Sequence, residues 1–235
     1  MLTENRVPFC FRETLNDFYN GRVTLTIHLL RHGQTALSRE DVFCGSGLDP
    51  ELTAEGLQMA HAFTAAARAL PWAGIYCSSL RRGIATAEPL CKELGLELQV
   101  RDELNEIAYG KWEGLKKERV EREYHDDYIS WLADPAWHPP TAGEAAVVIA
   151  RRGLRIIEEI KSRCPAGNVL IVSHKATIRI ILCSLLGIDV GRFRYRLVCP
   201  VGSVSRVEFT LHGPLLKALA DRTHLSEELR SLPGT

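Results

Sequence analysis

Two histidines in this chain stand directly after apolar runs, where β-strands are expected to end. Arg31, His32 and Gly33 follow the first run, and His174 comes shortly after the apolar run at residues 169–172. An arginine presents a planar fork of donors that suits phosphate, and a glycine lets the backbone turn sharply beside a bound group. If the two strands are neighbours in a parallel sheet, both imidazoles meet at its carboxyl edge. This pattern indicates a site that holds a phosphoryl group and uses a histidine as the nucleophile.

Two further segments supply cations and an acid. Ser78-Ser79-Leu80-Arg81-Arg82 is expected to place arginines at a helix N-terminus, where free N–H groups and the helix dipole favour anions. Glu106 follows another expected strand, and it can protonate a leaving alkoxide if burial raises its pKa. Each residue alone also has a structural interpretation, His32 and His174 as core histidines and Glu106 as part of an exposed acidic face.

Composition restricts the classes of partner. The 235 residues include 29 basic and 29 acidic side chains, so no overall field favours nucleic acid or an anionic membrane. The seven cysteines are scattered without a Cys-x-x-Cys pair, which is typical of reduced thiols rather than a disulfide framework or a zinc site. No signal-peptide pattern opens the chain, and the apolar stretch at residues 178–188 is too short to span a bilayer. We expect a cytoplasmic protein without a nucleic-acid or membrane partner, a metal or a cofactor.

Alternating strand and helix patterns must position the candidate residues. The expected strands cover residues 24–30, 74–77, 96–100, 169–172, 204–210 and 215–219. The expected helices cover residues 52–70, 80–94, 114–132, 144–163 and 176–186. Strands separated by helices predict an α/β fold in three layers, with a largely parallel central sheet and helices on both faces. Residues 1–22 are interpreted as an N-terminal extension and residues 23–235 as a single domain.

Several motifs in a fixed order give the chain a family resemblance. The matching segments are Leu30-Arg31-His32-Gly33-Gln34-Thr35, Leu52-Thr53-Ala54-Glu55-Gly56, Ser78-Ser79-Leu80-Arg81-Arg82 with Thr86-Ala87, Leu104-Asn105-Glu106, Gly110-Lys111-Trp112-Glu113-Gly114, Gly143-Glu144 and Val172-Ser173-His174. Together they resemble the histidine phosphatase superfamily, also called the phosphoglycerate mutase-like family, over about residues 24–187. The resemblance implies a phosphoglycerate mutase-like fold.

The same resemblance implies a role for each matching residue. His32 is then the phosphorylated nucleophile and Glu106 the proton donor. Arg31 and Arg82 clamp the phosphoryl oxygens, with Arg82 preferred to its neighbour by the family spacing. His174 completes the charged pocket. These groups supply electrostatically what a metal supplies elsewhere, so the resemblance implies no metal.

Departures from the family pattern concern the substrate. Ser38 stands where the family often has asparagine, and it can still donate a hydrogen bond. Lys175 replaces a small residue, usually glycine, so it either adds charge near the substrate or points away along the start of the helix. Gly45 and Tyr109 are further candidates for contact with the substrate.

The region at about residues 107–142 is expected to act as a lid. Mutases of the family carry a long insertion there, whereas this region is modest and its segment 110–114 resembles the phosphatase branch. We therefore expect a metal-independent phosphomonoesterase that acts through a phosphohistidine on a small phosphorylated metabolite. A cofactor-dependent phosphoglycerate mutase and a non-catalytic phosphate-binding module are the alternatives. The identity of the substrate, the oligomeric state and the role of residues 1–22 stay open.

Two groups of residues are expected to be structural. The packing anchors are Trp112, Trp131 and Trp137. The solvated face of the helix at 144–163 is expected to carry Arg151, Arg152 and Arg155.

Overall fold

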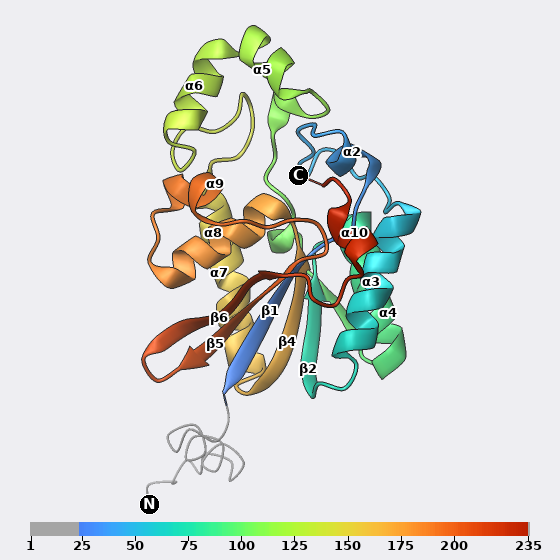
Figure 1. The fold of residues 1–235 in the computed structure, drawn as a ribbon. Coiled ribbons are helices and arrows are strands. Elements are labelled where there is room, and N and C mark those ends of the chain that lie inside the picture. The colour runs from blue at the N-terminus through green and yellow to red at the C-terminus, as the bar shows by residue number, and fades with distance from the viewer. Residues whose placement is uncertain (1–23, 235) are drawn as a thin grey trace, which may run out of the picture.

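A six-stranded sheet forms the centre of the computed structural model, which describes residues 24–234 (Figure 1). The strands are β1 (Leu25–Arg31), β2 (Trp72–Cys77), β3 (Leu98–Val100), β4 (Gly167–Ser173), β5 (Val204–Thr210) and β6 (Gly213–Asp221). Their order across the sheet is β3-β2-β4-β1-β5-β6. The first four strands pair in parallel, whereas β5 is antiparallel to both β1 and β6. The largely parallel sheet predicted from the sequence is confirmed.

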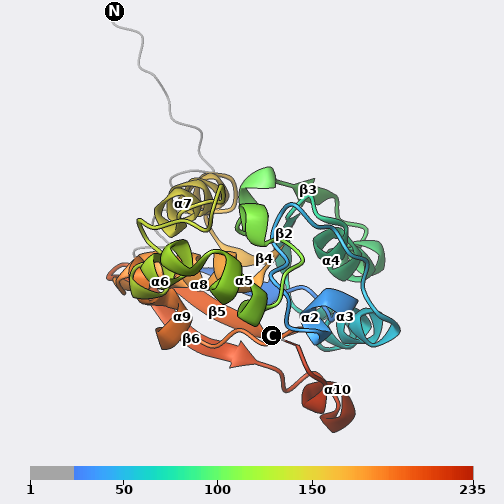
Figure 2. The ribbon, with the colours of Figure 1, turned by 90° about the horizontal axis from the view of Figure 1, so that it is seen from above.

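Four long helices cover the two faces of this sheet (Figures 1 and 2). On one face lie α3 (Ala54–Ala67) and α4 (Arg81–Leu94), and on the other lie α7 (Ala146–Arg163) and α8 (Lys175–Leu186). The shorter helices are α2 (Ala36–Arg39), α5 (Lys117–Glu123), α6 (His125–Ala133), α9 (Phe193–Arg196) and α10 (Glu227–Ser231). Tight 3-10 turns occur at Asp102–Leu104, Gly110–Trp112 and Val190–Arg192. The predicted three-layer α/β architecture is confirmed.

The central strands are buried on both sides, which explains their apolar sequences. In β4, Val169 and Ile171 pack in the core under α7 and α8, whereas Leu170 and Val172 pack in the core under α3 and α4. Successive side chains of a strand point to opposite faces, so a strand covered on both faces becomes continuously apolar. No helix within residues 24–234 is long and apolar enough to cross a membrane.

The helix boundaries follow local capping signals. The Thr53 hydroxyl accepts a hydrogen bond from the Gly56 N–H at 3.0 Å and so caps α3. Gly95 and Gly187 end α4 and α8 in the left-handed conformation, at φ values of 65° and 68°.

The single helix expected at 114–132 was wrong, because the segment forms two helices. Tyr124 separates α5 from α6 with non-helical backbone angles of φ −132° and ψ 40°. The break lets Val120 on α5 and Tyr128 and Trp131 on α6 pack against one cluster around Trp112. A straight helix would spread these side chains along its length instead of gathering them around Trp112. Burial of this cluster therefore determines the break.

Trp137 corrects the expected packing anchors, because 70 % of its surface is exposed while Trp112 and Trp131 are buried. The short helices α2, α9 and α10 carry too few residues for a periodic signal and were not predicted. The expected extension at residues 1–22 lies outside the described residues.

Candidate active site

The candidate histidines meet where β1 and β4 end. Arg31, the last residue of β1, pairs in register with Ser173, the last residue of β4. His32 and His174 are the next residues along each strand, and their ring centroids are 5.0 Å apart. The expected neighbourhood of these two strands is therefore confirmed.

His32 is a buried, neutral imidazole with a defined tautomer. Its Nδ1 lies 2.7 Å from the carbonyl oxygen of Gly33, and a carbonyl oxygen only accepts, so Nδ1 carries the proton. Burial, followed by the charges of Arg82 and Arg31, lowers the pKa of His32 well below its usual 6.5. Nε2 therefore keeps a lone pair at neutral pH, as a nucleophile requires.

His174 has the opposite tautomer and lies beneath the cavity. Arg82 Nε donates to His174 Nδ1 at 3.2 Å, so the proton of the neutral ring sits on Nε2 and faces Ser78 Oγ at 2.7 Å. Burial is the main cause that lowers the pKa of His174 well below 6.5. The sequence led us to expect His174 in a charged pocket, but this environment favours the neutral ring. Its contacts orient Arg82 and do not bring it to the cavity wall.

Arg82 is held rigidly by backbone oxygens. Nη1 donates to the carbonyl of Leu48 at 2.8 Å and Nη2 to that of Gly45 at 2.9 Å, and the side chain is fully buried. A Cβ at Gly45 would lie 2.1 Å from the carbonyl oxygen of Ile107, so only glycine lets these two loops touch. Gly45 therefore positions Arg82 and does not line the cavity. Arg81, the neighbour that the family spacing passed over, is exposed.

One N–H donor of Arg31 has no hydrogen-bond partner among the described residues. Its Nη1 donates to the carbonyl of Cys199 at 2.8 Å, while its buried Nε has no hydrogen-bond partner within residues 24–234. Burial lowers the pKa of Arg31 to about 10, which still leaves a full positive charge at neutral pH. A buried unpaired donor is costly unless a ligand fills it, and here it belongs to a residue on the cavity wall.

Glu106 is positioned by the N-terminus of α8. Its Oε1 accepts from the N–H groups of Ile107 and Thr177 and from the Thr177 hydroxyl, at 3.0 to 3.1 Å. Its Oε2 accepts from the Ala176 N–H at 3.1 Å. Four donors thus fix the carboxylate at the edge of the cavity, with Oε2 the less engaged oxygen.

The helix N-terminus expected to receive an anion was misplaced. The first N–H of α4, that of Arg81, donates to both carboxylate oxygens of Asp49, at 2.9 and 3.1 Å. That donor is occupied by the protein itself. At the site, the helix that offers its N-terminus is α8, and it holds Glu106.

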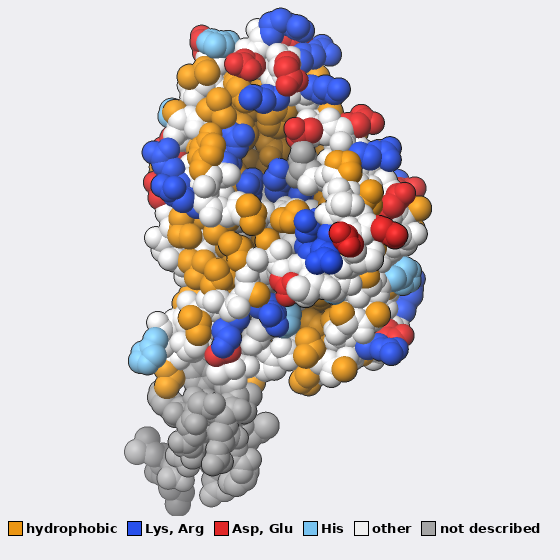
Figure 3. All heavy atoms as spheres, viewed as in Figure 1, with side chains coloured by type: hydrophobic (Ala, Val, Ile, Leu, Met, Phe, Trp, Pro, Cys, Tyr) orange, Lys and Arg blue, Asp and Glu red, His pale blue; other side chains and the backbone are white. Residues whose placement is uncertain are grey.

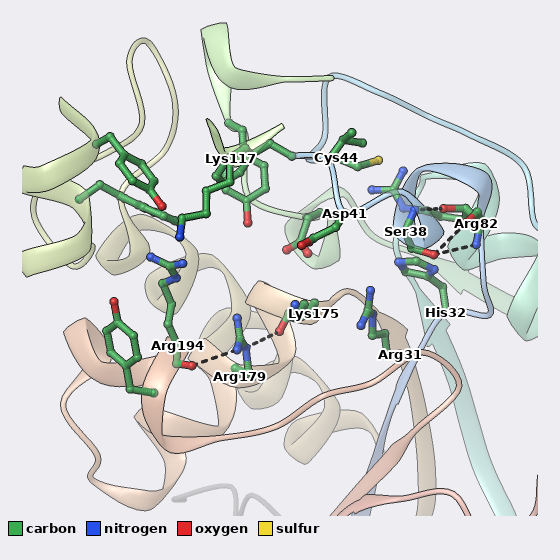
Figure 4. Close-up of a pocket in the computed structure, with 18 residues that line it drawn as sticks. Arg31, His32, Ser38, Asp41, Cys44, Arg82, Lys117, Lys175, Arg179 and Arg194 are labelled. Atoms are coloured by element: carbon green, nitrogen blue, oxygen red, sulfur yellow. Dashed lines mark hydrogen bonds between the residues drawn. The ribbon is translucent and has the colours of Figure 1, made fainter. Parts of the chain in front are cut away.

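A cavity of about 290 Å³ opens above the strand ends, between them and the α5–α6 region (Figure 3). Its inner end is formed by Arg31, His32, Arg82 and Glu106. Its aromatic walls come from Phe43, Tyr109, Tyr128, Trp131 and Tyr195. Further from His32, its cationic residues are Lys117, Lys175, Arg179 and Arg194 (Figure 4). The arrangement is suited to an anion at the inner end and offers more positive charge along the cavity.

Three of the four candidate substrate-binding residues line this cavity. Ser38 lies on the wall through the capping box of α2, in which the N–H of Ser38 donates to Thr35 Oγ1. Tyr109 joins the aromatic wall, and Lys175 starts α8 with its side chain on the cavity side. Burial, together with Arg31, lowers the pKa of Lys175 to about 8.

The sequence analysis did not identify the outer part of the cavity. The missed lining residues that carry polar or reactive groups include Asp41, Cys44, Lys117, Arg179, Arg194 and Tyr195. Arg179 had a signal, because it is the one cation in the apolar stretch at residues 178–188. Arg194 had none, because it sits among two other arginines between residues 192 and 196.

Arg152 corrects the expected solvated face of α7. Arg151 and Arg155 are exposed, but Arg152 pairs with Glu144, with Nε 3.0 Å from Oε1. Its Nη2 also donates to the backbone carbonyl of Glu106 at 3.3 Å. Arg152 therefore ties α7 to the loop that carries Glu106.

Comparison with known proteins identifies the family to which this chain is similar. A family model described as "Histidine phosphatase superfamily (branch 1)" matches residues 27–222. Phosphoserine phosphatase 1 of Hydrogenobacter thermophilus is 28 % identical over 85 % of this chain and 93 % of its own length. Adenosylcobalamin/alpha-ribazole phosphatase of Escherichia coli is 28 % identical over 69 % of this chain and 80 % of its own.

Solved structures agree with the fold. The alpha-ribazole phosphatase of Shigella flexneri superimposes with a TM-score of 0.77 at 25 % identity, covering 86 % of this chain and 99 % of that protein. The family match extends over most of the chain, from β1 to the end of β6, and includes every residue of the inner cavity. The chain belongs to branch 1 of the histidine phosphatase superfamily.

Proposed function

We propose that this protein is a metal-independent phosphomonoesterase that hydrolyses a small phosphorylated metabolite through a phosphohistidine on His32. The observation that carries the proposal is the neutral imidazole of His32 at a cavity end where Arg31 and Arg82 supply fixed positive charge. The enzyme class, a phosphoric monoester hydrolase, is also the one named for the relatives described above.

In the first step, the Nε2 lone pair of His32 attacks phosphorus while the bond between phosphorus and the ester oxygen breaks. Arg31 and Arg82 stabilise the charge on the phosphoryl oxygens, and the free Nε–H of Arg31 gains its partner. Glu106, in its protonated form, gives its proton to the leaving alkoxide and becomes a carboxylate.

In the second step, water takes the place of the alcohol. Glu106 accepts a proton from that water, the resulting oxygen nucleophile attacks phosphorus, and the bond to His32 breaks to give inorganic phosphate. Glu106 then holds a proton again, and His32 has recovered its lone pair. The cycle needs no group beyond these side chains and water.

The proposal treats residues 23–235 as one catalytic domain and residues 107–142 as its lid. That segment carries Tyr109 and Trp131, and it lies above the strand ends in Figure 1. A phosphoglycerate mutase must exclude water from the phosphohistidine, whereas hydrolysis needs water to enter. The named relatives favour hydrolysis.

The test compares wild type with His32→Ala on a panel of phosphomonoesters in EDTA. We expect phosphate release by wild type only, together with an acid-labile ³²P label on the wild-type chain after rapid quenching. His61→Ala, an exposed histidine on α3, is the matched control and should retain full activity. Release that persists in His32→Ala, or that EDTA abolishes, would overturn the proposal. Interconversion of 2- and 3-phosphoglycerate only with a bisphosphate primer would instead identify the mutase.

A further inference from the structure

Positive charge continues along the cavity well beyond the proposed phosphate site. Lys175 and Arg179 stand one turn apart on α8, and Figure 4 shows Lys175 between Arg31 and Arg179. Arg194, on α9, follows at the far end of the same view. Two arginines and Glu106 already serve the phosphoryl group, so these additional cations have no part in the steps above.

Arg194 is prepared to receive an anion. Its guanidinium lies over the ring of Trp131, with Cζ 3.8 Å from the ring centroid, which fixes the plane of the group. Its buried Nη1 has no hydrogen-bond partner in the described part of the chain. A fixed guanidinium plane with an unpaired donor suits a carboxylate or a phosphate.

Lys175 provides a second, more adaptable donor. Its ammonium makes no hydrogen bond to any residue between 24 and 234, and it shares the cavity with the acidic side chain of Asp41. Arg179 is different, because its Nη1 is directed at the backbone carbonyls of Arg194 and Leu197, both at 3.4 Å. Arg179 thus supports α9, whereas Lys175 and Arg194 keep donors for a ligand.

We propose that the substrate carries a second anionic group, a carboxylate or a second phosphate, which Lys175 and Arg194 bind while the scissile phosphate sits at His32. The proposal rests on the proposed function and narrows its substrate class. Phe43 and Tyr109 on the cavity wall offer apolar contact to the linking carbons. A phosphomonoester with a neutral far end would leave both cations unpaired.

A homologous series of synthetic esters tests this directly. The probes are ω-carboxyalkyl phosphates with two to six methylene groups, each compared with the alkyl phosphate of equal length. A second arm uses the corresponding α,ω-bisphosphates and so separates a carboxylate from a phosphate at the far end. We expect the anionic far end to raise kcat/KM about 10- to 100-fold, as for a charge-assisted hydrogen bond, with an optimum at one chain length.

Arg194→Gln should lower this preference ratio about 10-fold or more, whereas Arg196→Gln should leave the ratio unchanged. Arg196 is an exposed arginine on the same short helix and lies outside the cavity, so it is a matched control. Lys175→Gln is the second variant and should also lower the ratio, in case loss of the Trp131 contact unfolds α9. Melting temperatures of all three variants separate loss of recognition from loss of fold.

Binding to His32→Ala, measured by calorimetry, separates this inference from the proposed function. Tighter binding of ω-carboxyalkyl phosphates or bisphosphates than of alkyl phosphates supports the second anion site even if no ester is hydrolysed. Equal affinities, or a preference that Arg194→Gln and Lys175→Gln both leave intact, would overturn it. Hydrolysis by wild type without any preference would overturn only this inference and leave the phosphatase in place.

Discussion

His32 and His174 are neighbours with opposite hydrogen bonds at Nδ1, which donates in His32 and accepts in His174. The carbonyl of Gly33 requires a proton on Nδ1 of His32, and the Nε–H of Arg82 requires a lone pair on Nδ1 of His174. One ring is left with a free nucleophilic nitrogen, and the other directs a buried arginine. The sequence alone does not distinguish the two histidines, because Arg82, the partner of His174, comes from a distant segment, and the Gly33 contact of His32 exists only in the folded geometry.

Nitrogen-15 NMR of labelled histidine should show these two tautomers directly. We expect His32 to carry its proton on Nδ1 and His174 on Nε2, with neither ring titrating near pH 6.5, since burial lowers both pKa values. Protonation of His32 close to pH 6.5 would contradict the lowered pKa, and a proton on Nε2 of the neutral ring would contradict the tautomer.

Burial of the Lys175 ammonium in the cavity lowers the free energy of unfolding. Its pKa falls from 10.5 to about 8, so between those values the unfolded chain binds more protons and stability rises with pH. Below pH 8 both states are charged and the cost is complete. Lys175→Gln should therefore raise the free energy of unfolding at pH 7 by about 1–3 kcal/mol.

Urea unfolding at pH 7 and pH 10 measures this effect, and the gain should shrink at the higher pH. Exposed Lys111→Gln is the control and should change stability by less than about 0.5 kcal/mol. Destabilisation by Lys175→Gln at pH 7 would mean that the ammonium has a partner that offsets its burial. Loss of anion recognition together with gained stability would show a trade between function and stability.

At the scale of elements, two glycines let β1 and α3 touch. A Cβ at Gly33 would lie 2.3 Å from the carbonyl oxygen of Gly56, and a Cβ at Gly56 would lie 2.2 Å from that of Gln34. The backbone of the β1 exit thus rests directly on the first turn of α3. The Thr53 N–H adds a hydrogen bond to the Gln34 carbonyl at 2.9 Å. These contacts position the turn that carries His32.

Gly56→Ala should destabilise the protein although alanine is the better helix former. The added methyl group meets backbone, which cannot move aside as a flexible side chain can, so we expect a net loss of about 1–3 kcal/mol. Displacement of Gln34 should also lower kcat/KM, because His32 lies two residues away. Gln58→Ala, at an exposed position of the same helix, should leave both quantities nearly unchanged. Equal behaviour of the two variants in denaturation and kinetics would refute the close-contact argument.

The elements that the sequence predicted are those with a strong periodic or apolar signal. The continuous run at 169–172 predicted β4, and the alternation of strands with helices predicted the layers and the carboxyl-edge site. The break at Tyr124 was missed, since the helical pattern continues across it and only packing around Trp112 interrupts it. Arg194 was missed because α9 is four residues long and gains its place in the cavity only by packing on α8.

At the scale of the whole molecule, zero net charge conceals a strongly uneven distribution. Acidic and basic residues cancel over the sequence, yet the cavity gathers cations around two acidic side chains, Asp41 and Glu106, among its described lining residues. Burial of histidines favours their neutral form both at the site and elsewhere in the fold. Burial lowers the pKa of each of four histidines, namely His28, His32, His174 and His224.

These histidines should make stability depend on pH below 6.5. Below pH 6.5 the unfolded chain binds protons that the folded chain does not bind, so the free energy of unfolding falls as pH falls. Each histidine contributes a slope of about 1.4 kcal/mol per pH unit once its unfolded form is protonated and its folded form is not. Urea unfolding between pH 7.5 and pH 5 measures the combined change in the free energy of unfolding. His32→Ala should reduce the slope by the contribution of one histidine, about 1.4 kcal/mol per pH unit. Gln58→Ala, at an exposed position without a titrating group, should leave the slope unchanged. A stability that stays flat down to pH 5 would mean that the buried rings bind protons in the folded protein as readily as in the unfolded chain, and it would contradict the lowered pKa values of His32 and His174.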